Sequence, residues 1–524
     1  MLRPPQRRRA YIRKLFNESS SPASESTIAR DSFRTGMKAI AKIALDAASM
    51  REVTYADARA VFTRARSLTT KNGLVGHASE SESLGIAVRV IVDGAWGFAA
   101  TAELGSSAIR ATAHRAVEIA KASARVKKEN VRLAPEPPAV AEWTSPYDVD
   151  PFSTSVENNL ALLLKVDAEI RSNAGVTLAE TGMNFQREES WFLSSEGADI
   201  HQTKFTTGAG YTAHAFAGSE IQKRSYPNSF GGQWQNRGYE LIDEMKLVEN
   251  ARRIGDEAVA LHHADQCPEG PRTIILDGSQ LGLQIHESIG HPIELDRVLG
   301  MEANFAGTSF LTLEKLGKLR YGSELVNVVA DARQEHGPGL GTFAYDDEGV
   351  AAQSTPIISN GRFTGYLSSR ETAHTIGANR SGGTSRAEGW NRLPMIRMTN
   401  VSILPGDQPL TLEQLIASTD DGIYMETNKS WSIDDKRYNF QFGCEIAWEV
   451  KHGKRTRMLK NPSYSGITTE FWNSMDAICS HDEWVLWGTP NCGKGQPQQV
   501  VGTGHGASPA RFRNVKVGTA YKGS

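Results

Sequence analysis

Helical and strand-like hydrophobic patterns alternate along the first half of the chain. Apolar residues recur at helical spacing in four segments: 34–49, 107–126, 155–172 and 240–263. Strand-like patterns cover 84–100, where Asp93-Gly94 predicts a hairpin turn, and 176–215, which is punctuated by glycine. This mixture predicts helices that pack on a sheet.

The second half has a different pattern, with one strand at 273–276, a helix from near Ser279 and then mostly short strands. The short strands are expected at three places: 324–329, 356–358 and 365–367. The main boundary is placed at Cys267-Pro268, where the long helical pattern has ended. The predicted fold class is therefore α+β, with a smaller N-terminal α/β domain and a β-rich C-terminal domain around one central helix.

This boundary divides the chain into three parts. Residues 1–30 are a basic, serine-rich arm that we expect to be disordered. Residues 31–267 are the N-terminal α+β domain, with a proline-rich connection near 133–152 between its subdomains. Residues 268–524 are the β-rich C-terminal domain.

Composition and charge narrow the class of protein. Hydrophobic residues make up 39% and charged residues 23% of the 524 residues, as is typical of globular proteins. The 58 Lys and Arg against 60 Asp and Glu give a formal charge of −2, which favours neither nucleic acid nor a membrane as a partner. No apolar run is long enough to span a bilayer. Four irregularly spaced cysteines and the lack of a signal peptide predict a cytoplasmic location.

One short stretch of the predicted central helix carries chemistry. His286, Glu287 and His291 form an H-E-x-x-x-H pattern. The familiar zinc-hydrolase spacing is H-E-x-x-H, which places both histidines on one helical face. With one residue more, the two side chains of an ideal α-helix lie about 140° apart. Gly290 and Pro292 flank the second histidine and predict a wider, π-like turn that brings His291 back toward His286.

A metal held by two neutral imidazoles would activate a water molecule, with Glu287 as the general base. The alternative is an ordinary buried helix end with two hydrogen-bonded histidines. A catalytic zinc needs a third protein ligand. The candidates are Glu294, Asp296, Cys267, Cys444, Cys479, Cys492 and His505. Cys492 is preferred, because a tight glycine-rich loop and the nearby Lys494 would both favour its thiolate.

Other segments have rival interpretations. Residues 488–494 fit the start of a phosphate-binding loop, but the expected hydroxyl residue and the following helix are missing, which disfavours nucleotide binding. The acidic residues 346–348 could bind a cation or a substrate amine, although a polar turn is preferred. His505 is a candidate donor to a developing oxyanion.

Several segments in order resemble the TldD/PmbA family of metallopeptidases, over roughly residues 32–517. These segments are 88–101, 286–291, 343–367, 392–400 and 488–504. The family has a TldD-like subunit that bears the metal and a TldE/PmbA-like subunit that lacks it. Because His286, Glu287, His291 and Cys492 are all present, the chain resembles the TldD-like subunit.

The resemblance implies one Zn²⁺ ion, or another divalent transition metal, on His286, His291 and Cys492, with Glu287 as the catalytic base. It also implies cleavage of extended or unfolded peptides, in proteolysis or peptide maturation, and a heterodimer with a TldE/PmbA-like partner; a homo-oligomer is the alternative assembly. Two other functions stay open. One is a non-catalytic peptide-binding subunit with a structural metal, and the other is a metal-dependent amide hydrolase in natural-product processing.

Overall fold

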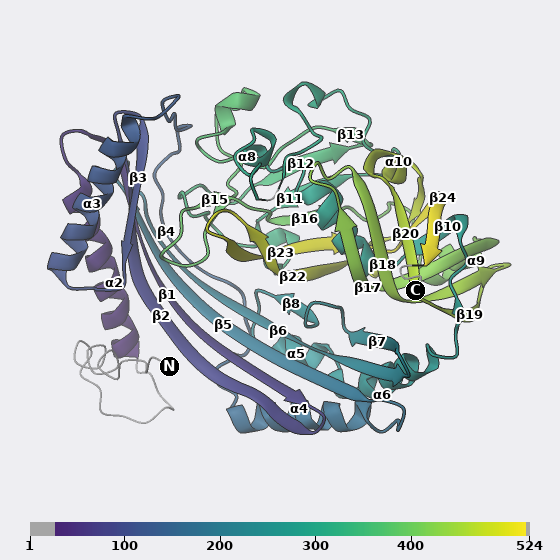
Figure 1. Cartoon of the computed structure of the whole chain (residues 1–524). Coiled ribbons are helices and arrows are strands. Elements are labelled where there is room, and N and C mark those ends of the chain that lie inside the picture. Colours follow the sequence, from purple (N-terminus) through teal and green to yellow (C-terminus); the bar gives the residue numbers. More distant parts are fainter. Residues whose placement is uncertain (1–26, 306, 520–524) are drawn as a thin grey trace.

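The computed structural model describes residues 27–305 and 307–519, and the predicted basic arm lies, up to residue 26, outside the described residues (Figure 1). A long, curved sheet of eight strands dominates the first half, in the order β3-β2-β1-β5-β6-β4, with β7 and β8 attached to β6. Its strands are β1 (Val53–Lys71), β2 (Leu74–Val92), β3 (Ala95–Thr101), β4 (Val140–Thr144), β5 (Leu178–Ser194), β6 (Asp199–Ala217), β7 (Glu220–Tyr226) and β8 (Gln233–Gln235).

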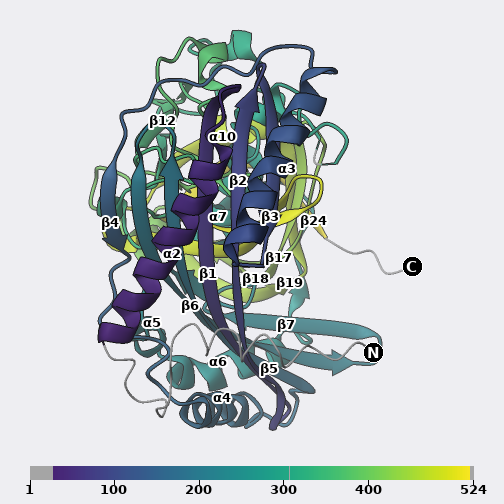
Figure 2. The same cartoon turned by 90° about the vertical axis from the view of Figure 1, so that its left-hand side faces the viewer.

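Helices cover the convex face of this sheet, as the two views show (Figures 1 and 2). They are α2 (Thr27–Ala48), α3 (Ser106–Ala124), α4 (Val156–Ile170), α5 (Glu240–Glu244) and α6 (Leu247–Ala260). Helices α2 and α3 pack on one part of the sheet, and α4 and α6 pack on another, each pair with its own apolar core. The predicted hairpin at Asp93-Gly94 is confirmed, and both residues have positive φ (48° and 72°), as this turn requires.

One predicted helix is wrong in its extent. The single helix expected over 240–263 is two helices, α5 and α6, because Lys246 has a left-handed backbone with φ of 49°. The apolar pattern does not reveal the break, since Leu241 before it and Leu247 after it are both buried.

The second half contains two larger sheets and a two-stranded ribbon. The first sheet closes on itself, because β17 pairs with both β10 and β18. Its strands are β9 (Asp265–Gln266), β10 (Gly270–Leu276), β17 (Asp421–Ile433), β18 (Asn439–Lys451), β19 (Lys454–Lys460), β20 (Pro462–Ile467), β21 (Met475–Ile478) and β24 (Ala510–Thr519). The other strands are β11 (Val328–Asp331), β12 (Ser354–Ser359), β13 (Arg362–Phe363), β16 (Asn400–Ile403), β22 (Val485–Lys494) and β23 (Gln499–Ala507), with β14 (Ser385–Arg386) and β15 (Met395–Ile396) forming the ribbon.

Two expected strands in this half differ from the structure. Of 324–329, only the last two residues belong to a strand, β11. Residues 365–367 are not a strand, although Leu367 forms an isolated bridge with Glu294. The α+β class and the β-rich second half are confirmed. No helix of the described residues is long and apolar enough to cross a membrane.

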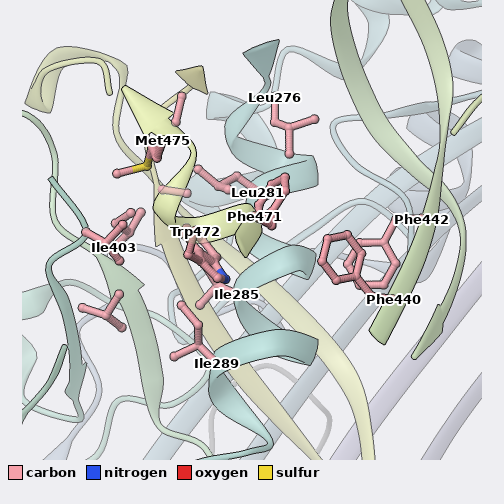
Figure 3. Close-up of a cluster of buried hydrophobic side chains, with 14 of the residues drawn as sticks. Leu276, Leu281, Ile285, Ile289, Ile403, Phe440, Phe442, Phe471, Trp472 and Met475 are labelled. Atoms are coloured by element: carbon pink, nitrogen blue, oxygen red, sulfur yellow. The ribbon is translucent and has the colours of Figure 1, made fainter. Parts of the chain in front are cut away.

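The central helix of the second half is α7 (Gly278–Ile285), which continues as the π-helical turn η1 (His286–Gly290). Leu281, Ile285 and Ile289 recur every four residues and pack in the large core beside Trp472 and Met475 (Figure 3). The remaining helices are α8 (Leu295–Val298), α9 (Leu412–Ala417), α10 (Thr468–Asn473), and the 3₁₀ turns η2 (Leu313–Lys315), η3 (Gln334–His336), η4 (Ala373–Ile376) and η5 (His481–Glu483). Packing of one face of α7 thus fixes the turn that bears the histidines.

Buried ion pairs join the curved sheet to the second half. Arg89 on β2 lies 2.7 Å from Asp57 on β1 and 3.2 Å from Glu348, which belongs to the predicted acidic turn. The turn itself is confirmed, because Asp346 accepts hydrogen bonds from the backbone N–H groups of Glu348 and Val350. The carboxylates at 346–348 therefore stabilise the fold.

Candidate metal centre

The turn from His286 to Gly290 has the π geometry that the sequence predicts. The backbone N–H of His291 donates to the carbonyl of His286 at 3.1 Å, five residues earlier, as in a π-helix. Gly290 is needed here because a Cβ atom would lie 2.2 Å from the sulfur of Met398. This wider turn accommodates the extra residue of the motif, so that both imidazoles lie on one side of the helix.

Three potential metal ligands meet at this turn. The donor atoms of His286, His291 and Cys492 all lie within 4.8 Å of one another, and the three residues are buried. The sulfur of Cys492 is 3.9 Å from Nε2 of His291. Ligand atoms around a tetrahedral zinc ion lie about 3.3–3.6 Å apart, given usual Zn–N and Zn–S bond lengths. Two nitrogens and one sulfur at these separations fit a zinc ion after a small contraction.

Hydrogen bonds orient the imidazole of His286. Nδ1 of His505 donates to the carbonyl of Val401 at 3.0 Å, so its Nε2 is left as an acceptor. Nδ1 of His286 lies 2.7 Å from that Nε2 and must therefore carry the proton that it donates. The hydrogen-bond network thus assigns the free lone pair of His286 to Nε2, which is available for a metal.

His291 is oriented by a carboxylate in the same way. Its Nδ1 donates to Oε2 of Glu294 at 3.0 Å, which leaves Nε2 toward Cys492. Glu294 in turn lies 3.2 Å from Arg297 and 3.3 Å from Lys494. Nε2 is therefore the free nitrogen of both histidines, and a hydrogen-bonding partner holds each ring.

The electrostatic surroundings favour the protonation states that bind metal. Burial lowers the pKa of both His286 and His291, which keeps them neutral. Burial alone would raise the pKa of Cys492, but the positive charge of Arg397 and the contact with His291 outweigh it and lower the pKa. A lowered pKa favours the thiolate, which is the ligand form of cysteine.

The reason given for Cys492 from sequence was partly wrong. The segment 488–494 is strand β22, paired with β23, and not a tight loop, so it cannot cradle a phosphate either. Lys494 does not serve the thiol: its Nζ contacts Asp296 at 2.7 Å and Glu294. Arg397 supplies the positive charge instead, and it also donates to the carbonyl of Cys492.

The other candidate ligands have different environments. Glu294 and Asp296 are occupied by the cations described above. The remaining cysteines are buried, and burial raises the pKa of Cys267 and of Cys479 to about 12 and that of Cys444 well above its usual value. A thiol that stays protonated is a poor ligand. His505, a candidate ligand and a candidate oxyanion donor from sequence, contacts Nδ1 of His286.

Glu287 is buried at the same turn, next to His286. Its Oε2 accepts a hydrogen bond from Nη1 of Arg437 at 2.7 Å. Neither Arg437 nor the role of His505 was found from sequence. No local sequence signal marks Arg437, because it lies in a hairpin 150 residues from Glu287. The only sequence signal for His505 is its place in the segment GTGHG, near Cys492.

Comparisons with known proteins identify the family of the chain. A model of the PmbA/TldA metallopeptidase C-terminal domain matches residues 269–519, and a model of PmbA/TldA metallopeptidase domain 1 matches residues 56–120. A metalloprotease of Methanothermobacter thermautotrophicus is 31% identical over 89% of this chain and 96% of its own length. A metalloprotease TldD homologue of Buchnera aphidicola is 27% identical over 84% of this chain and 87% of its own length.

Solved structures share the fold. A Thermotoga maritima protein described as a modulator of a DNA gyrase has a TM-score of 0.71 at 17% identity, over 93% of this chain and all of its own (100%). TldE from Thermococcus kodakarensis has a TM-score of 0.67 at 16% identity, over 92% of this chain and 99% of its own. At these identities the structures show the fold alone, whereas the domain models and the curated relatives show descent. The chain belongs to the PmbA/TldD family of metallopeptidases.

Proposed function

We propose that this protein is a zinc-dependent peptidase whose metal ligands are His286, His291 and Cys492. The observation that carries the proposal is the convergence of two nitrogens and one sulfur within 4.8 Å, beside a buried glutamate. Three protein ligands of this kind are typical of a catalytic zinc site, which keeps its fourth position open for water or substrate. Among divalent ions, a thiolate with two imidazoles favours zinc over magnesium or calcium.

Each residue of the proposed centre would have a distinct chemical role. A bound zinc ion supplies Lewis acidity, which polarises a carbonyl and makes water more acidic. His505 and Glu294 hold the two imidazoles in their ligand tautomers. Glu287 accepts the proton of the attacking water and delivers it to the leaving amine, since it is the carboxylate adjacent to the first ligand.

A cavity on the other side of the β22–β23 pairing suits an extended peptide, although none of His286, Glu287, His291 and Cys492 lines it. It has a volume of about 620 Å³ and lies between β1, β5 and β6 of the curved sheet and the β22–β23 hairpin. Val501 lines it, and Val501 pairs directly with Cys492 across the hairpin. Trp234 and Trp390 also line it, together with polar side chains that can bind peptide groups. We infer that peptides are the substrate class and that, as the name of the TldE neighbour suggests, a TldE-like subunit is the partner.

The exchange Glu287→Gln tests this function. The amide keeps the size of the side chain but cannot accept a proton, so zinc should stay bound at one ion per chain while peptide turnover falls by about 10²–10⁴-fold. The measurement is cleavage of an unfolded peptide library, alongside metal analysis, with and without a TldE-like partner.

A matched control is Glu314→Gln on the exposed turn η2, which should leave turnover unchanged. Turnover near that of the wild type in Glu287→Gln would refute the role of this base. Absence of bound zinc in the wild-type protein would refute the metal site.

A further inference from the structure

Arg437 is held rigidly at the tip of the β17–β18 hairpin. Its backbone N–H donates to the carbonyl of Asp434 at 2.8 Å, and its φ of 64° is left-handed, as this tight turn requires. The carboxylate of Asp434 accepts from the N–H of Tyr438 at 2.7 Å, and Thr468 donates to the carbonyl of Arg437 at 3.0 Å. The side chain of Arg437 therefore leaves a backbone that is fixed on both sides.

A second segment anchors the same turn. The N–H of Thr308 donates to the carbonyl of Asp435 at 3.0 Å, and the N–H of Phe310 donates to that of Lys436 at 2.9 Å. The tip is thus held between Thr468, at the start of α10, and the segment that follows α8. This rigidity matters, because a group that acts on a reacting atom must be held in place before the reaction.

The guanidinium reaches into the metal centre from the hairpin. Its contact with Glu287 is 2.7 Å long, and the exposed fractions of the two side chains are 16% and 8%. Glu287 directly follows His286 in the π turn η1, so this contact places the guanidinium next to the proposed ligand set.

We propose that Arg437 is a further catalytic residue, which donates a hydrogen bond to the carbonyl oxygen of the scissile peptide bond as that oxygen becomes negative. This proposal rests on the proposed peptidase function. The contact with Glu287 places the guanidinium beside the group that activates water, and the attacked carbonyl must come next to that water.

The movement of charge explains why one arginine serves both groups. When water adds to the carbonyl carbon, a C–O bond forms, the π pair of the carbonyl moves to its oxygen, and the proton of water passes to Glu287. The negative charge thereby leaves the carboxylate and appears on the carbonyl oxygen. When the C–N bond breaks, the oxygen pair re-forms the carbonyl and Glu287 returns the proton to the leaving amine. A guanidinium with five N–H donors stays next to a negative charge throughout.

The test uses the full-length protein loaded with zinc and compares Arg437→Met, Arg437→Lys and Lys436→Met. Lys436 is the exposed neighbour on the same turn and is the matched control. Loss of one oxyanion donor lowers kcat by about 10²–10³-fold. Arg437→Met should show this loss with KM within threefold and with unchanged zinc content, Arg437→Lys a smaller loss, and Lys436→Met none.

The affinities of two inhibitors distinguish two roles of Arg437. In one role it stabilises the oxyanion, and in the other it only holds Glu287 in place. A phosphinic peptide carries a negative oxygen in place of the carbonyl, whereas the matching reduced-amide peptide carries none. In Arg437→Met the affinity for the phosphinic peptide should fall by the same factor as kcat/KM, and that for the reduced amide should stay within threefold.

Three results would overturn the proposal. The first is a kcat of Arg437→Met within threefold of the wild type. The second is an unchanged ratio of the affinities for the phosphinic and reduced-amide peptides in this variant. The third is a fractional loss of bound zinc that equals the fractional loss of activity in both Arg437 variants. If the zinc-loaded wild type cleaves no peptide, the proposed function fails, whereas the ratio of affinities still decides the role of Arg437. If Arg437→Met does not fold, the ratio measured in Arg437→Lys decides.

Discussion

At the scale of single residues, the centre depends on partners that set the protonation of its ligands. His505 is fully buried, and burial lowers its pKa well below the usual value, so it stays neutral. With its Nδ1–H bonded to Val401, its Nε2 cannot donate and accepts from His286 at 2.7 Å, beside the hydroxyl of Thr503 at 3.1 Å. His286 thus resembles a metal-ligating histidine with a fixed tautomer, in which the second nitrogen is bound to a neighbouring group.

The exchange His505→Leu should therefore weaken zinc binding without removing a ligand. It leaves Nδ1 of His286 without this acceptor, and loss of such a partner typically costs about 10–100-fold in metal affinity. Competition with a chromophoric chelator measures the affinity. His452→Leu is the control, because His452 is exposed on a surface turn. Equal affinities of the two variants would show that His505 does not tune the ligand.

At the scale of elements, the residues within the motif predict the π turn, but the sequence does not predict some of the strands around it. Gly290 and Pro292 lie within the motif, so the widened turn could be predicted from neighbouring residues. The hydrophobic pattern does not predict strand β1, although β1 lies in the middle of the curved sheet, because its mixed polar and alanine-rich sequence has no clear apolar alternation. The glycines of β22 predict a loop, but pairing with β23 makes this segment a strand.

The proposed ligands could be predicted from the sequence, whereas the residues that contact them could not. The two histidines and the glutamate are within six residues, and Cys492 was preferred from the character of its segment. His505 lies on strand β23, whereas Arg397 and Arg437 lie in the loops between β15 and β16 and between β17 and β18, so their places at the centre depend on the register of strands distant in sequence. A single sequence does not fix that register, so these contacts could not be predicted from it.

At the scale of the whole molecule, buried ion pairs hold the curved sheet against the half that contains the candidate metal centre. Arg89 contacts Asp57 within the sheet and Glu348 across the junction, and the exposed fractions of these three side chains are only 5–6%. Arg224 on β7 similarly contacts Glu445 on β18 and Glu426 on β17, at 3.4 and 3.2 Å. The cavity of about 620 Å³ lies along this junction, so its shape depends on how the two halves meet.

The exchange Arg89→Met should destabilise the protein strongly. It leaves the carboxylates of Asp57 and Glu348 buried without their cation, and breaking a buried pair in this way costs about 3–5 kcal/mol. Denaturant titration gives the free energy of unfolding. Lys451→Met, which removes an exposed pair with Asp421, should cost less than about 1 kcal/mol. A loss of similar size in both variants would mean that Arg89 does not join the two halves.

The central claim is that one metal ion binds to two imidazoles and one thiolate. X-ray absorption at the zinc edge of the purified full-length protein tests it most directly. We predict one zinc ion per chain with one sulfur at about 2.3 Å and two nitrogens at about 2.0–2.1 Å, and loss of the sulfur signal in Cys492→Ser. A zinc ion surrounded only by nitrogen and oxygen in the wild type, or an unchanged sulfur signal in Cys492→Ser, would contradict this account.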